Sequence, residues 1–488
     1  MKRYAFLSAI AAVMAVISSC SEGFFDYSAE KVYGIMELPD DDTSGDKFDS
    51  ITDNKFIRTA DENISTFSID ADGAAYSYMK RSIGYGCLPD ANAVRIEEFL
   101  NYFTYDYADP VGNDAVAISS EVGDCPWNSS HKLLRLGIKG KSIAQNEMPL
   151  ANFVFLVDVS GSMSSADKLP LLKDGLSTMV DYLNPNDRVS IITYSGKVRK
   201  VLESTLASDA KQIKKAISKL TASGSTNGGD AIKMAYKEAL DNFIAGGNNR
   251  VIMGTDGDFN VGVTSTDALL ELVEENAKNG IYLTVCGFGS GNLNDAMMEK
   301  VSNSGNGTYE YIADEGDLTK VFVNERSKFL SVANDVKVQV TFDTAKVEEY
   351  RLIGYENRVL SNEDFENDEK DAGELGAGQT VTALYELVLA DGAESSDALG
   401  KFDLRYKKAL GSESILLSTN FVNGTDLSPE TSFAASLAAF GMMLRVSPYK
   451  GDADYDMVLS LARKGTAFDP FDYRKAFVVL VQKAKTIE

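Results

Sequence analysis

The middle of the chain, from about residue 151 to about residue 328, alternates between short apolar runs and longer amphipathic segments. The apolar runs are nearly continuous, which is typical of strands buried on both faces. The longer segments carry apolar residues at helical spacing. This alternation predicts a parallel, doubly wound α/β sheet. Strands are expected at 153–157, 189–194, 251–255 and 281–288, and helices at 169–183, 210–220, 228–243 and 266–279.

The region before this domain, residues 54–150, combines helical and β-type patterns. Two helical segments, at 74–83 and 93–103, are separated by a turn that contains Pro89, a residue that interrupts helices. Short β-type runs follow at 115–122 and 132–139.

After residue 329 the pattern changes to period-two alternation, which predicts antiparallel strands and a β-sandwich at 329–425. We hypothesise that the earlier strands at 115–139 complete this sandwich, so that the α/β domain is an insertion between its halves. The strands are expected at 336–342, 349–353, 380–389, 401–406 and 414–421, and a C-terminal helical region at 426–488 with helices at 429–446, 454–462 and 472–483.

The N-terminus has the pattern of an export signal. Lys2 and Arg3 precede an apolar run that ends in Ser18, Ser19 and Cys20, and the run is too short to span a membrane comfortably. It resembles a bacterial lipoprotein signal, with a mild departure in the residues before the cysteine. That resemblance implies a signal peptide at 1–19 and acylation of Cys20, followed by an acidic, flexible spacer at 20–53. The alternative is an ordinary signal peptide with a coincidental cysteine.

The net charge of −24, from 72 acidic and 48 basic residues, argues against nucleic acid as a partner, because phosphate backbones require clustered Lys and Arg. The acidity fits either simple solubility or one basic partner. The chain has a single histidine, His131, which excludes zinc sites built on histidine pairs and disfavours a serine–histidine hydrolase.

Three cysteines follow Cys20 in the chain. Cys286 lies in an apolar run and is expected in the core. Cys87 and Cys125 lie in the same N-terminal region, and an exported protein permits a disulfide between them, so that pairing stays open. A cluster of acidic residues further on is expected to be a solvated loop, because its spacing does not match a calcium-binding EF-hand. The cluster consists of Asp364, Glu366, Asp368, Glu369 and Asp371.

The strongest chemical signal lies at the ends of the α/β strands. The first strand ends in Asp158-Val-Ser160-Gly-Ser162, Thr226 precedes a predicted helix, and Asp256 follows the strand at 251–255. The carboxyl ends of parallel strands form the ligand-binding edge of such sheets. Two carboxylates and three hydroxyls form a hard-oxygen donor set, which suits Mg²⁺, Ca²⁺ or Mn²⁺ rather than zinc or copper.

These residues resemble the metal-ion-dependent adhesion site of von Willebrand factor type A domains, whose fold is Rossmann-like. The Asp-x-Ser-x-Ser motif matches Asp158, Ser160 and Ser162, and the threonine and aspartate of the next two loops match Thr226 and Asp256. An ion held by so few carboxylates can accept another from a partner protein, which implies a cation-bridged interaction. Asp258 and Asp230 are candidates for supporting the ligands.

The resemblance extends to bacterial YfbK-like proteins. It is carried by segments that include 65–70, 94–98, 125–128, 355–358 and 433–444, and it covers most of the chain. This match implies the architecture, whereas the lipoprotein-like N-terminus implies a cell-envelope protein that is lipid-anchored to a membrane, with the outer membrane favoured.

Three functions follow as hypotheses, of which a cation-dependent adhesion or interaction protein without catalytic activity is favoured. The first alternative is a structural assembly factor that does not depend on metal exchange. The second is a metal-dependent hydrolase, for which Asp258 is the sole nearby candidate base.

Overall fold

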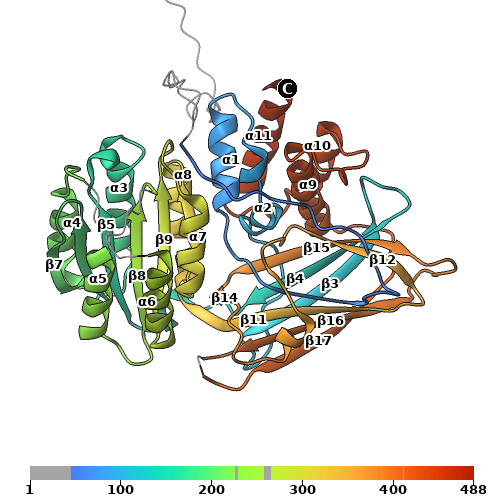
Figure 1. Ribbon diagram of the computed structural model, residues 1–488, viewed down its shortest axis with the longest axis horizontal. Helices are drawn as coiled ribbons and strands as arrows, with labels where there is room; N and C mark the ends of the chain where they lie inside the picture. Colours follow the sequence, from blue (N-terminus) through green and yellow to red (C-terminus); the bar gives the residue numbers. More distant parts are fainter. Residues whose placement is uncertain (1–44, 226–228, 258–264, 410, 488) are drawn as a thin grey trace, which may run out of the picture. The chain divides into compact units, whose positions relative to one another are not determined.

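The computed structural model describes residues 45–225, 229–257, 265–409 and 411–487 (Figure 1). Thr226, Asp258 and Cys20 lie outside these residues, as does the expected signal peptide. In the described part of the chain, no helix combines the length and the apolar character that crossing a membrane requires.

The α/β domain is built on a six-stranded sheet in the order β10-β9-β8-β5-β6-β7. Its parallel core is as expected, because the four predicted apolar runs are its central strands, and only the edge strands β7 and β10 lack a sequence counterpart. β7 runs antiparallel to β6. The strands are β5 (Ala151–Asp158), β6 (Arg188–Tyr194), β7 (Arg199–Leu206), β8 (Asn248–Thr255), β9 (Ile281–Phe288) and β10 (Tyr309–Ile312).

Helices cover both faces of this sheet, so the domain is doubly wound (Figure 1). In β5 the side chains alternate: Phe155 packs with the helices of one face and Leu156 with those of the other. One face carries α3 (Leu169–Val180), α4 (Ala210–Ser218) and α8 (Glu315–Thr319), and the other carries α5 (Gly229–Asp241), α6 (Thr266–Lys278) and α7 (Asp295–Ser304).

The remaining strands form two antiparallel sheets that share one apolar core. The first has the order β1-β12-β15-β4-β3 and contains β1 (Ile57–Arg58), β12 (Val347–Ile353), β15 (Thr380–Leu389), β4 (Lys132–Gly140) and β3 (Val116–Asp124). The second has the order β13-β2-β11-β16-β17, with β14 paired to β11, and contains β13 (Val359–Leu360), β2 (Ile64–Ser68), β11 (Ser331–Phe342), β16 (Ala398–Lys407), β17 (Ile415–Val422) and β14 (Gly373–Gly376).

The sandwich therefore uses strands from both sides of the α/β domain. β4 pairs along its length with β15, and β2 pairs with β11. This is the arrangement hypothesised from the strands at 115–139, and β2 adds a strand that the sequence pattern did not reveal. The division into separate regions at 54–150 and 329–425 describes order along the chain, whereas in space both regions build one sandwich.

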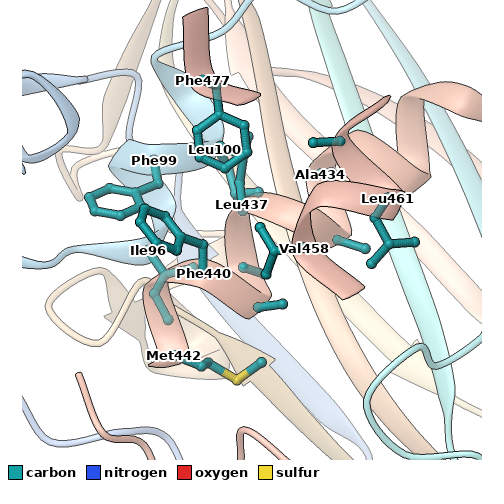
Figure 2. Packing of buried hydrophobic residues seen from close by; sticks show 14 of the residues in the cluster. Ile96, Phe99, Leu100, Ala434, Leu437, Phe440, Met442, Val458, Leu461 and Phe477 are labelled. Atoms are coloured by element: carbon teal, nitrogen blue, oxygen red, sulfur yellow. The ribbon is translucent and has the colours of Figure 1, made fainter. Parts of the chain in front are cut away.

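A helical core covers the outer face of the first sheet, because Leu384 of β15 points away from the sandwich and into the helices. The N-terminal helices α1 (Ala74–Gly84) and α2 (Ile96–Asn101) pack there with α9 (Pro429–Leu444), α10 (Tyr455–Lys464) and α11 (Tyr473–Ile487). Figure 2 shows Ile96 and Phe99 of α2 against Phe440 of α9, and a Cβ on Gly441 would lie 2.9 Å from Ile96.

The cysteines of the described chain are free, so the suggested pairing of Cys87 with Cys125 is wrong for this structure. Cys87 is exposed after α1, whereas Cys125 is buried in the helical core. Cys286 is buried in the α/β domain, as expected. The end of the expected spacer contacts the α/β domain: the Asp46 carboxylate accepts hydrogen bonds from the amides of Gly291 and Leu293, at 2.7 and 2.9 Å.

Candidate metal centre

The candidate site lies where two neighbouring parallel strands end. β5 and β8 pair in register up to Val157 and Gly254, so Asp158 and Thr255 are the next residues on adjacent strands. The side chains of Asp158 and Asp256 are fully buried. The topology therefore brings together two carboxylates that are far apart in the sequence, as the carboxyl ends of parallel strands do.

Asp158 is held by the turn that follows it. Its Oδ1 accepts a hydrogen bond from the amide of Ser160 at 2.8 Å, and the Thr255 hydroxyl lies 3.4 Å from its Oδ2. The hydroxyl oxygens of Ser160 and Ser162 are 3.0 Å apart, and Ser162 is exposed. Burial raises the pKa of Asp158 to about 6, and the charge of Asp256 adds to this, while the hydrogen bonds from Ser160 lower it.

The two oxygens of Asp256 are in different surroundings. Oδ2 accepts a hydrogen bond from the Lys168 ammonium group at 2.9 Å. Oδ1 is buried and, within the described chain, has no hydrogen-bond partner. A buried acceptor without a partner is costly, and because this one lies beside the strand-end hydroxyls, a cation bound there would give it a partner. The donor set and this free oxygen together fit a hard divalent cation.

Lys168 is the residue that sequence reasoning missed. It is buried, it also contacts Asn292 through its Nζ at 3.2 Å, and its aliphatic stem lies against the Cα of Gly289. A Cβ at position 289 would overlap that stem, and the backbone there has a φ of +72°. No local motif marks Lys168, because its partner is 88 positions away along the chain.

The second loop of the motif reaches the site through its backbone. The Gly161 amide donates to the Gly224 carbonyl at 2.9 Å, and the Ser223 amide donates to the Val159 carbonyl at 2.7 Å. Asp230, which the sequence suggested as a supporting group, is exposed in the first turn of α5. Within the described chain, no hydrogen bond or ion pair joins it to the candidate ligands.

A second acidic group forms around the predicted solvated loop. The carboxylates of Asp335, Asp371 and Glu374 lie within 4.8 Å of one another. The Lys407 ammonium group is 2.7 Å from Asp335 and supplies a positive charge there. A lysine lies beside each group, so charge does not separate them, but of these two described acidic groups only the one at the end of β5 and β8 has the hydroxyls of Ser160 and Ser162, which makes that strand end the candidate site.

Comparison with known proteins agrees with this architecture. The model of the von Willebrand factor type A domain matches residues 152–324, and the model of the C-terminal part of the uncharacterised protein YfbK matches residues 327–487. A third model, described as von Willebrand factor, matches residues 42–135. The uncharacterised protein YfbK of Escherichia coli (strain K12) is 37% identical over 467 residues, which are 90% of this chain and 81% of that protein. The chain belongs to the YfbK family.

Two further proteins are similar to part of the chain. The human inter-alpha-trypsin inhibitor heavy chain H4 is 31% identical over 202 residues, which are 39% of this chain and 21% of that protein. A solved structure of a von Willebrand factor type A protein from Catenulispora acidiphila covers 76% of this chain and 91% of its own, at 15% identity and a TM-score of 0.44. The type A assignment rests on the family models, which place that domain on the sheet that carries Asp158 and Asp256.

Proposed function

We propose that this YfbK-family protein binds a divalent cation at its type A domain and, through the ion, a carboxylate of a partner protein. The observation that carries the proposal is the buried, unpartnered Oδ1 of Asp256 at the strand end that also holds Asp158. Mg²⁺ is the expected ion, with Ca²⁺ or Mn²⁺ as alternatives, because all the donors are hard oxygens. Thr226 is expected to contribute the remaining hydroxyl.

The charge of the site favours an external anion. Lys168 offsets one of the two carboxylates, so a bound divalent ion leaves the centre with a net positive charge. A buried positive centre that reaches solvent beside Ser162 attracts an Asp or Glu side chain. We infer from this that recognition, rather than storage of the ion, is the role of the site.

The surroundings favour binding over catalysis. Hydrolysis at a metal needs a positioned base. His131 lies at the β3–β4 turn, where its Nδ1 contacts the Glu386 carboxylate at 2.6 Å, and Lys168 is ion-paired to Asp256. Neither is available as a base at the strand end, and Asp258, the candidate base named from the sequence, lies outside the described residues. We propose that the protein binds through the ion and is not an enzyme.

We also propose that the protein is anchored in the bacterial envelope, in the outer membrane, through an acylated Cys20. The support is the N-terminal pattern alone. Full-length protein should remain with the membrane fraction and dissolve in detergent, whereas an exported Cys20→Ala variant should become soluble. A processed variant that still sediments with membranes would contradict the anchor.

The first test is titration of the purified protein with Mg²⁺ by calorimetry, comparing Asp158→Ala with Asp174→Ala. Asp174 is an exposed residue of α3, so its variant removes the same charge without touching the site. We expect Asp158→Ala to lose more Mg²⁺ affinity than the roughly 10–100-fold that removal of an outer-shell partner costs, because it removes a direct ligand, and Asp174→Ala to bind normally. Unchanged binding by Asp158→Ala would remove the site assignment.

The second step is a pull-down from envelope extract with the same three proteins, in Mg²⁺ and in EDTA. A partner retained only in Mg²⁺ and only by proteins with an intact Asp158 supports the cation bridge. A partner retained under every condition would instead support the structural assembly factor, which needs no metal exchange.

A further inference from the structure

A basic groove opens beside the candidate metal centre. It has a volume of about 350 Å³ and lies between the β6–β7 hairpin and the segment that follows α4. Its apolar lining comes from Val159, Val201 and Leu220, and Val201 is 40% exposed. The groove thus offers apolar surface as well as charge, which suits a polypeptide better than a small inorganic anion.

The charge of this groove is opposite to that of the chain as a whole. Its lining, among the residues that the structure describes, contains Lys197, Arg199 and Lys219 and no carboxylate, although the chain carries a net charge of −24. All three basic side chains are exposed, and none forms an ion pair with a residue that the structure describes.

Lys200, the residue after Arg199 in β7, shows that the unpaired positive charge belongs to one face of the strand. Lys200, whose side chain alternates with that of Arg199, pairs with Glu203 at 2.9 Å and with Glu238 at 2.6 Å. The chain therefore neutralises the cation on one face, whereas those on the groove face have no ion-pair partner among the described residues. Unpaired charges of one sign in a concave surface attract ligands of the other sign.

The groove is continuous with the metal centre. Val159, which lines it, is the residue between Asp158 and Ser160, and its carbonyl accepts the hydrogen bond from Ser223. The hairpin packs on the same loop, since a Cβ on Gly224 would lie 3.5 Å from the Ser195 hydroxyl. A chain segment that reaches the strand end can therefore extend along the groove.

We propose that this groove receives an acidic segment of the partner protein. One carboxylate of the segment would face the cation, and neighbouring carboxylates would pair with Lys197, Arg199 and Lys219. This inference rests on the proposed function, and it names the chemistry of the partner at the same site. Charge complementarity of this kind sets association rate and specificity and weakens as salt is added.

The test measures binding of a fluorescent oligo-aspartate peptide to the full-length protein in Mg²⁺, by fluorescence anisotropy, with oligo-asparagine as the uncharged probe. The groove variant is Lys197→Glu/Arg199→Glu. The matched control is Lys211→Glu/Lys215→Glu, which reverses the same number of charges at exposed positions of α4 outside the groove.

We expect the groove variant to lose about tenfold or more in oligo-aspartate affinity, with a weaker salt dependence, and the control to lose much less. The Mg²⁺ affinity of the groove variant should stay the same or rise slightly, because positive charge near the ion has been removed. All the exchanged residues are exposed, so both variants should melt like the parent protein.

The possible failures are distinct. A parent protein that does not bind Mg²⁺ would overturn the proposed function itself. Two outcomes would overturn only the proposal for the groove. One is a parent protein that binds Mg²⁺ but does not prefer oligo-aspartate to oligo-asparagine, and the other is an equal loss of oligo-aspartate affinity in the groove and control variants. Tighter binding of a single-stranded oligonucleotide than of oligo-aspartate would also overturn it, in favour of a phosphate polymer.

Discussion

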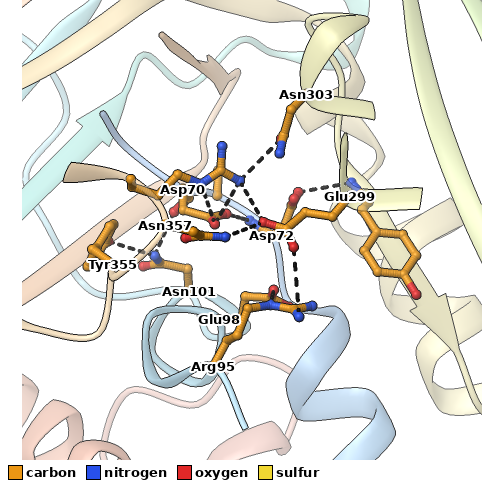
Figure 3. A network of polar contacts seen from close by, with 12 residues as sticks. Asp70, Asp72, Arg95, Glu98, Asn101, Glu299, Asn303, Tyr355 and Asn357 are labelled. Carbon is orange, nitrogen blue, oxygen red and sulfur yellow. Dashed lines mark hydrogen bonds and ion pairs between the residues drawn. The ribbon is translucent and has the colours of Figure 1, made fainter. Parts of the chain in front are cut away.

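Two of the regions in which this structure buries carboxylates are built differently. At the end of β5 and β8, Asp158 and Asp256 share their surroundings with hydroxyls and one lysine. In the second region, shown in Figure 3, carboxylates from the segment around Asp70, from α2 and from α7 are paired with arginines.

The arginine network joins the α/β domain to the rest of the chain. Arg95 donates to Glu98 and, at 2.6 Å, to Asp295 of α7, and Arg358 lies 2.8 Å from Asp70. Asn357, next to Arg358, donates to Glu299 of α7 at 2.6 Å. These contacts hold α7 against the loop that follows β12.

The comparison shows that buried carboxylates alone do not identify a metal site. Both regions contain a buried carboxylate oxygen without a hydrogen-bond partner, Oδ1 of Asp256 and Oε2 of Glu97. Burial raises the pKa of Glu97 to about 8, so near neutral pH a proton occupies that carboxyl group. Asp256 instead lies at a strand end beside the hydroxyls of Ser160 and Ser162, at an edge that solvent reaches, and this difference makes the first region the candidate cation site.

The largest expected effect is on the arginine network. Arg95→Met leaves Glu98 and Asp295 without their cation, and breaking a buried pair in this way costs about 3–5 kcal/mol of stability. Urea unfolding should show this loss, while Mg²⁺ affinity should not change. Arg463→Met, at an exposed position of α10, is the control. A loss no larger than that of the control would mean that the network does not hold the domains together.

A smaller effect is expected from Glu97→Gln. Burial raises the pKa of Glu97 from 4.5 to about 8, and the charges of Glu356 and Asp70 add to this. Between these values the folded protein keeps a proton that the unfolded chain has lost, so this contribution to stability is complete below about pH 4.5 and disappears as pH rises through 8.

Glu97→Gln removes that titration, because glutamine is neutral at every pH. At pH 9 the variant should be more stable than the parent by about 1–2 kcal/mol. Thermal melts from pH 5 to pH 9 measure how the stability of each protein changes with pH. Glu363→Gln, at an exposed position, is the control. A parent protein whose stability does not fall over this interval would contradict the assignment of a bound proton.

The smallest effect is expected at Lys168, where it tests the charge of the metal centre. Lys168→Met removes the positive charge beside Asp256 and keeps the length of the stem that packs on Gly289. Mg²⁺ affinity should rise about tenfold, since repulsion of the ion is lost. Binding of oligo-aspartate should weaken, because the loaded centre is then less positive. Weaker Mg²⁺ binding would instead show that Lys168 mainly orients Asp256.

Some of this structure follows from local sequence. Runs such as 153–157 and 281–288 are continuously apolar because both faces of a central parallel strand are covered by helices, and they predicted β5 and β9. The Asp158 motif likewise predicted its own turn. The edge strand β7 was missed, because most of its residues are exposed and carry no apolar run.

What the sequence by itself determined is therefore the type A domain, the strand-end positions of Asp158 and Asp256 and the alternating strands of the sandwich, since each depends on neighbouring residues. The tertiary structure alone decided that β2 joins β11, that Lys168 reaches Asp256, that Arg95 meets Asp295, and that Cys87 and Cys125 stay apart. The physical reason is that these contacts join residues far apart along the chain, and their charge or shape becomes complementary only after the sheets have packed.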